Sequence, residues 1–156
     1  MKILVAIDGL MFSEAAIRAL ARVIRSTDDE VLLLHVIEPP AFFEQDASLR
    51  ERLTRPEQRL KQASQELETS GFEVEVRVIE GEARTGILSV AQQWQPDLIV
   101  LGSHGRKRLD RFLMGSVAES VALHSSCSVL IVRVPLARCP ERVASEYRSE
   151  TQAAPA

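Results

Sequence analysis

DLIVLGSHGRKRLDRFLMGSV, residues Asp97 to Val117, is the stretch that decides the fold. It starts as an apolar run that stops at Gly102, as a buried parallel strand does where it leaves the carboxyl edge of a sheet. It ends at Gly115-Ser116, which opens a segment of helical periodicity and for which Ser116 is a suitable N-cap. Ligands of open α/β sheets bind at the carboxyl edge. The stretch therefore predicts a strand, a ligand-binding loop and a helix.

The glycines of this loop predict a phosphate site. Gly102 and Gly105 bracket a tight turn, where a missing Cβ atom permits positive φ and lets a ligand approach backbone N–H groups. The helix start at Gly115-Ser116 offers free N–H groups and the positive end of a macrodipole, which favour phosphate oxygens. The spacing, G-x-x-G, nine residues and G-S, is neither a Walker A loop nor the dinucleotide fingerprint. The alternative is a plain strand-to-helix connection whose basic residues only face solvent: Arg106, Lys107, Arg108 and Arg111.

Length and composition limit the class of protein. The chain has 156 residues, 46% hydrophobic and 26% charged, which suits one globular domain. Its net charge of -3 argues against a general nucleic-acid-binding role. Two cysteines outside any C-x-x-C pair suit reduced thiols, and no apolar run approaches the length of a membrane span. We expect a cytoplasmic protein that contacts neither nucleic acid nor membrane.

Patterns along the rest of the chain predict a doubly wound, Rossmann-like α/β fold. Strands are expected at residues 2–7, 31–37, 72–79, 98–101 and 128–134, with helices near 13–24, 49–70, 83–94 and from 116. Pro56 should divide the second helix and Gly71 should cap its end, whereas the alternation in 72–79 marks an edge strand. We expect a five-stranded parallel sheet of order 3-2-1-4-5 with helices on both faces. Residues 1–135 form the domain, and 136–156 form a partly helical or disordered extension.

Several motifs in this chain resemble those of the universal stress protein family, in addition to the glycine spacing. They are VAIDG at 5–9, LLHVI at 33–37, PDLIVLGSHG at 96–105 and CSVLIVR at 127–133. The resemblance covers residues 2–134. It implies an adenine nucleotide alpha hydrolase-like fold, ATP bound with Mg²⁺, a role in the stress response, and a homodimer in which strand 128–134 pairs antiparallel with its mate.

The resemblance also assigns site residues. It implies that Asp8 belongs to the ATP site, that Ala6 and Ile7 wall the adenine pocket, and that the main chain of Val36 reads the adenine edge. Mg²⁺ would be held by the phosphates and by Asp8 through water, with no direct protein ligand. The candidate binding set is Ala6, Ile7, Asp8, Val36, Leu101, Gly102, Ser103, His104, Gly105, Arg106, Gly115, Ser116 and Val117.

Each assignment has a structural alternative. Asp8 is also the first residue of an Asp-Gly turn, Val36 is also an ordinary buried valine, and His104 is also a solvent-exposed turn residue. His35 reads as a core histidine that has its hydrogen bond, and His124 falls in the last turn of a helix, where positive charge is favourable.

The sequence departs from the family pattern at two places. Leu10 stands where members often have serine, which removes a polar group near the nucleotide. Lys107-Arg108 stand where small residues are commoner, which either strengthens phosphate attraction or crowds it.

A regulatory ATP sensor is the function that these features favour. We expect slow ATP hydrolysis at most and no catalytic residue, because the chain lacks a nucleophile elbow and a positioned base. The regulatory protein partner is not indicated by the sequence. Three alternatives remain: an adenylating, pyrophosphate-releasing ATPase, whose S-G-G-x-D-S loop is missing here; a phospho-receiver domain; and an interaction module that binds no nucleotide.

Overall fold

The computed structural model describes residues 1–7, 16–20, 24, 29–38, 56–103 and 114–133. Residues 16–20 are helical. The remaining elements are β1 (Lys2–Ile7), β2 (Glu30–Ile37), α3 (Pro56–Thr69), β3 (Glu73–Glu80), α4 (Ala83–Trp94), β4 (Leu98–Gly102), α5 (Ser116–His124) and β5 (Ser128–Val132).

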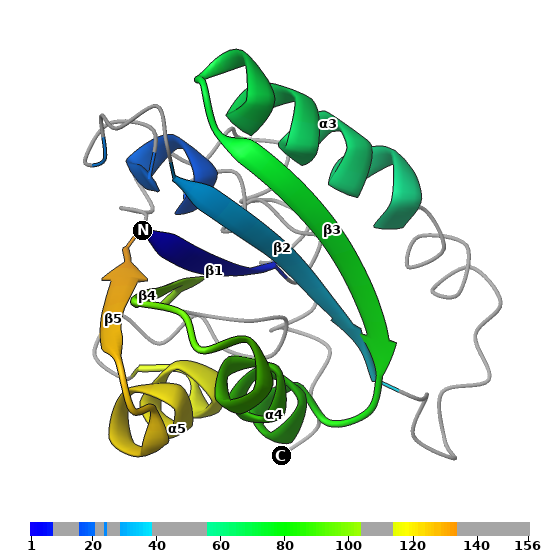
Figure 1. Cartoon of the computed structure of the whole chain (residues 1–156). Coiled ribbons are helices and arrows are strands. Elements are labelled where there is room, and N and C mark those ends of the chain that lie inside the picture. Colours follow the sequence, from blue (N-terminus) through cyan, green and yellow to red (C-terminus); the bar gives the residue numbers. More distant parts are fainter. Residues whose placement is uncertain (8–15, 21–23, 25–28, 39–55, 104–113, 134–156) are drawn as a thin grey trace, which may run out of the picture.

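One five-stranded sheet of order β3-β2-β1-β4-β5 organises these elements, which confirms the predicted order. All four strand pairs are parallel. β1 and β4 lie side by side although they are far apart in the sequence, and β3 and β5 form the two edges (Figure 1). The carboxyl ends of all strands therefore meet along one side of the sheet.

Helices cover both faces of the sheet, and the alternation of side chains along the strands divides the core into two layers. In β1, Ile3 and Val5 point toward the layer of residues 16–20 and α3, whereas Leu4 points toward the layer of α4 and α5. All three side chains are fully buried. This explains why β1 reads as a continuous apolar run.

The boundaries of α3 follow its proline and glycine. Pro56 is the first residue of the helix, a position where its fixed φ fits and its missing N–H is not needed. Gly71 has a φ of +95° and donates its N–H to the carbonyl of Glu68, and the N–H of Phe72 bonds Leu67. The predicted glycine cap is thus confirmed. The predicted helical residues 49–55 lie outside the described part of the chain.

The amino-terminal ends of the central strands are tied together by paired charges and main-chain bonds. The Met1 ammonium contacts Asp29, whose side chain is 4% exposed. The N–H of Lys2 donates to the carboxylate of Asp97 (2.7 Å), and the N–H of Asp97 donates back to the carbonyl of Lys2 (2.8 Å). The Lys2 ammonium also lies 5.2 Å from the centre of the Trp94 ring, a cation–π contact.

No helix among the described residues is long and apolar enough to cross a bilayer.

Candidate functional site

The candidate site begins where β1 and β4 end together. Ala6 pairs with Leu101 in the parallel register, so Ile7 and Gly102 are the last residues of neighbouring strands. This is the point at which the sheet reverses its winding, where α/β folds bind ligands. Asp8 follows Ile7 directly and lies outside the described residues.

Two main-chain hydrogen bonds bring the start of α5 back to the end of β4. The N–H of Ser103 donates to the carbonyl of Val132 on β5 (2.9 Å), which extends the β4–β5 pairing by one residue. The N–H of Gly115 then donates to the carbonyl of Ser103 (2.8 Å). Ser103 is 1% exposed, so this junction is buried. The two glycine-marked ends of the loop are therefore neighbours in space.

The start of α5 corrects one prediction. Gly115, not Ser116, is the N-cap: it has extended backbone angles (φ −62°, ψ 145°), and its carbonyl accepts the first helical bond, from Glu119 at 2.9 Å. Ser116 is already the first helical residue, so its side chain cannot cap. No side chain caps the helix among the described residues. The first N–H groups of α5 therefore have no side-chain acceptor in the part of the chain that the structure describes.

The conformation of Gly102 corrects a second prediction, that of a turn at this glycine. It ends β4 in extended conformation, paired with Val132, and positive φ occurs among the described glycines only at Gly71 and Gly81. Gly102 is therefore not part of the expected turn, because the strand hydrogen bonds continue through Ser103. Gly105, the second glycine of that turn, lies outside the described residues.

His35 fixes the end of β1. Its ring is 3% exposed, and Nδ1 lies 2.9 Å from the carbonyl oxygen of Ile7, its register partner. Because a carbonyl only accepts, Nδ1 carries the proton and donates. The prediction of a core histidine with a satisfied hydrogen bond is confirmed. This bond holds the residue that immediately precedes Asp8.

Val36 has the opposite orientation and packs against α4. It is partly buried, and a Cβ built on Gly86 would lie 3.3 Å from both of its methyl carbons and 3.0 Å from Cδ1 of Ile79. A glycine in α4 is therefore what lets the helix approach the end of β2. This close contact fixes the position of the Val36 main chain, which the resemblance connects with adenine.

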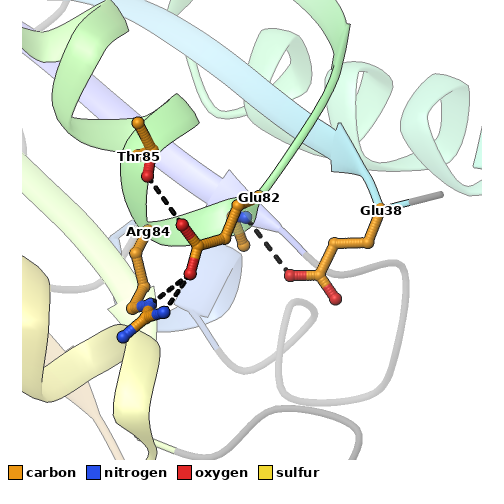
Figure 2. A network of polar contacts seen from close by, with 5 residues as sticks. Glu38, Glu82, Arg84 and Thr85 are labelled. Carbon is orange, nitrogen blue, oxygen red and sulfur yellow. Dashed lines mark hydrogen bonds and ion pairs between the residues drawn. The ribbon is translucent and has the colours of Figure 1, made fainter. Parts of the chain in front are cut away.

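A polar network joins the ends of β2 and β3 to the start of α4 (Figure 2). The carboxylate of Glu38 accepts a hydrogen bond from the N–H of Ala83 (3.2 Å). Glu82 accepts bonds from the hydroxyl of Thr85 (2.8 Å) and from the guanidinium of Arg84. The Thr85 hydroxyl, and next the Arg84 guanidinium, hold the pKa of Glu82 below its usual value. The start of α4 is thus occupied by carboxylates of this chain.

Glu38 and Gly86 were not among the predicted site residues. A carboxylate directly after a strand and a glycine inside a helical pattern are the sequence signals that could have found them. Of the predicted set, the structure brings together Ala6, Ile7, Leu101, Gly102, Ser103, Gly115, Ser116 and Val117 at one edge, with Val36 at the end of the next strand. The other members, Asp8, His104, Gly105 and Arg106, lie outside the described residues, as do Leu10 and Lys107-Arg108.

The electrostatics of this edge favour an anion at α5. The N-terminal N–H groups carry partial positive charge, and Glu119 in the first turn is the acidic residue that interacts with it. Metal ligation has less support, since the described residues contain no group of three or more His, Cys, Asp or Glu side chains able to hold an ion.

Comparison with known proteins identifies a family and solved structures that share this fold. The model of the universal stress protein family matches residues 1–133. The solved structure of the universal stress protein MJ0577 of Methanocaldococcus jannaschii has a TM-score of 0.67 and 30% identity, covering 86% of this chain and 96% of its own.

Two further solved structures share the fold at lower identity. A universal stress protein in complex with cAMP has a TM-score of 0.61 and 24% identity, covering 85% of this chain and 96% of its own. A family protein from Arabidopsis thaliana with AMP bound has a TM-score of 0.65 and 18% identity, covering 92% and 99%. Since the family model spans nearly all of the sequence, this chain belongs to the universal stress protein family.

Proposed function

We propose that this chain binds ATP at the carboxyl edge between β1 and β4 and acts as a regulatory nucleotide sensor. The phosphates would lie against the start of α5, and the adenine against Ala6, Ile7 and the Val36 main chain. Nucleotide binding would shift the population of conformers at this edge and so change a surface that a regulatory partner reads.

The observation that carries the proposal is the bond from the Gly115 N–H to the Ser103 carbonyl (2.8 Å). It places the uncapped start of α5 beside the last residues of β4, and β4 lies beside β1. An anion there meets both free helical N–H groups and the positive end of the macrodipole.

The class of ligand is supported by relatives. Two proteins of the same fold have adenine nucleotides bound, cAMP in one and AMP in the other. An uncapped helix start suits the phosphates of either, and it suits the longer chain of ATP equally. Mg²⁺ would arrive with the phosphates and would neutralise part of their charge, with Asp8 as its contact through water.

Hydrolysis should be slow at most. Among the described residues, His35 is the imidazole nearest to the end of β1, and its Nδ1 donates to the Ile7 carbonyl. Its Nε2 keeps a lone pair, but the residue is only 3% exposed, so the ring is not open to an attacking water molecule. The sensor would report nucleotide binding rather than turnover.

The sensor would act as a homodimer. β5 is an edge of the sheet, and its four apolar residues, Val129 to Val132, are only partly buried. Antiparallel pairing of strand 128–134 with its mate would cover this edge. Sedimentation at micromolar concentration should then give a dimer. A wild-type protein that stays monomeric would refute this pairing.

Thermal unfolding with a panel of nucleotides tests the binding function. ATP, ADP, AMP, cAMP and GTP are compared, each with and without Mg²⁺. A nucleotide at 100 times its Kd should add about 2.7 kcal/mol of apparent stability. We expect ATP to stabilise more than GTP, because the adenine edge is read by the main chain of β2. No shift with any adenine nucleotide would refute the proposal.

Two substitutions at the start of α5 separate nucleotide binding from helix stability. Ser116→Glu should stabilise the free protein by about 0.3–1 kcal/mol through the macrodipole, yet weaken ATP binding by repelling phosphate. Glu119→Gln should destabilise the free protein and strengthen ATP binding. Gln62→Glu, exposed in the middle of α3, is the matched charge control and should change neither. If Ser116→Glu binds ATP as wild type does, α5 does not hold the phosphates.

A further inference from the structure

The outer edge of β3 is unpaired in the described sheet. β3 stands at the end of the strand order, next to β2, and Figure 1 shows it as the long outer strand beside α3. Every second residue of an edge strand directs its N–H and C=O away from the sheet. β3 extends over eight residues, so it offers a row of main-chain partners long enough for another strand.

On the side of β3 that faces α3, the edge is hollowed into a groove with apolar side chains at its base and polar side chains of α3 along its side. Val76 is 43% exposed and Val78 is 45% exposed, which is unusual for valines inside a strand. Together with Leu60 they form the floor of an open groove of about 440 Å³. Its wall comes from α3, where Lys61 and Glu68 project. The groove therefore suits small apolar side chains that enter from beside β3.

The α4 side of the same edge is acidic. By the alternation of the strand, Glu73 and Glu75 lie on this side with Arg77. Arg77 donates to Glu75 (2.6 Å), so its charge is shared with that carboxylate. Glu80 lies on the α3 side by the same alternation, so the α4 side of β3 has two acidic residues against one basic residue. A strand added to this edge would meet apolar surface on one face and net negative charge on the other.

We propose that the outer edge of β3 binds an extended peptide segment of another protein, in which apolar side chains alternate with lysine or arginine. The added strand would bond to the free main-chain groups of β3. Its apolar side chains would enter the groove over Val76 and Val78, and its basic side chains would lie beside Glu73 and Glu75. This site goes beyond the proposed nucleotide sensor and does not depend on it.

A second copy of the chain fits this edge less well. A β3 strand from another copy would bring the same excess of acidic residues. Pairing at β3 in addition to the proposed pairing at β5 would also join copies at both edges of the sheet, which propagates without closing. A basic and apolar segment from a different protein avoids both problems.

The test uses a defined probe, an acetylated and amidated eight-residue peptide of alternating lysine and valine, added to the full chain. Binding is measured by calorimetry, and the site by amide NMR shifts and hydrogen exchange. We expect shifts and new protection in β3. Replacing the valines by serine, or the lysines by glutamate, should weaken binding about ten-fold or more. Equal binding of the glutamate peptide, or shifts confined to other elements, would overturn the proposal.

Variants of the protein sharpen the test. Glu75→Lys should weaken the lysine–valine peptide about ten-fold, whereas Glu66→Lys, exposed on α3 and outside the groove, changes the net charge equally and should leave binding unchanged. Val76→Thr with Val78→Thr keeps β-branched side chains and should weaken binding without unfolding the strand. An equal loss of peptide affinity in Glu66→Lys would overturn the proposal. Self-association of the wild-type protein that Val76→Lys abolishes would also overturn it, because a second copy of the chain would then occupy the edge.

Discussion

The two ends of the central strands differ in how they use their polar groups. At the amino-terminal end, polar groups of this chain pair with one another: the Met1 ammonium with Asp29, the Lys2 main-chain N–H with the Asp97 carboxylate, and the Lys2 ammonium with the ring of Trp94. At the carboxyl end, the first N–H groups of α5 face the junction of β1 and β4 without a side-chain cap among the described residues. The polar groups at the amino-terminal end bond to one another, whereas the first backbone N–H groups of α5, at the carboxyl end, have no side-chain cap among the described residues.

This difference separates stability from function along the same strands. A change at the amino-terminal end should alter the free energy of unfolding and leave nucleotide binding intact. A change at the carboxyl end should alter both, because the groups that fix the strand ends there also position the candidate site. The predictions below test this separation.

Substitution of His35 should cause the largest loss of stability and of ATP affinity. His35→Leu removes the donor to the Ile7 carbonyl and leaves a buried acceptor unpaired, which costs about 1–3 kcal/mol. Because the same carbonyl precedes Asp8, ATP affinity should fall as well. Urea unfolding and calorimetric titration measure the two effects. His35→Asn, whose amide can replace the Nδ1 donor, should restore part of each, and loss of stability without any loss of affinity would break the comparison.

Gly86→Ala should give a smaller effect. The new methyl group would lie 3.0 Å from Ile79 Cδ1 and 3.3 Å from the Val36 methyl carbons, which is tighter than ordinary van der Waals contact, so these side chains would have to shift. Overpacking outweighs the gain in helix propensity of about 1 kcal/mol, so we expect a net loss of about 1 kcal/mol. ATP binding should weaken with it through Val36. Ser89→Ala, exposed one turn later in α4, is the control for helix propensity alone. A stabilised Gly86→Ala variant would contradict the tight contact.

Alkaline pH should weaken only the amino-terminal end. The hydrogen bond to Asp29 raises the pKa of the Met1 amine above its ordinary value of 8.0. An amine raised in the folded state contributes stability that is complete below the unfolded pKa and is lost as pH rises through the folded pKa. Stability measured by urea unfolding should therefore fall above pH 8 in wild type and fall less in Asp29→Asn. Identical pH profiles would show that the pair contributes nothing.

Protonation of Glu82 at acid pH should cause the smallest loss of stability. Its pKa is lowered from the ordinary value of 4.5 by the Thr85 hydroxyl and the Arg84 guanidinium. A lowered carboxyl pKa gives stability that is present above the unfolded pKa and lost as pH falls through the folded pKa. Glu82→Gln should flatten the stability profile slightly between pH 5 and 3. The side chains are half exposed, so the change will be small, and a steeper profile in the variant would contradict it.

The fold could be predicted from the sequence because its signals are local. Continuous apolar runs marked β1, β2 and β4 as buried strands, and alternation marked β3 as an edge. The strand order followed from rules of connection and from the family resemblance. Boundaries moved by a residue where hydrogen bonds, not residue types, decide them, as at Gly115 and Ser116.

The site was predictable only in part. The glycines located its edge, but the bond from Gly115 to Ser103 depends on how residues far apart on the chain return to one another. The roles of Glu38 and Gly86 likewise arise from contacts between β2 and α4: the sequence marks both residues as unusual for their positions, but it does not show which groups they contact. Residue type indicated the chemistry, and tertiary contacts determined which groups could supply it.

The Gly115 to Ser103 bond has an evolutionary consequence. Since both of its atoms belong to the main chain, the segment between these residues can change sequence from one family member to another while its two attachment points stay put. Under the proposed nucleotide-binding function, a connecting segment exchanged between relatives at these two residues should carry its ligand preference with it.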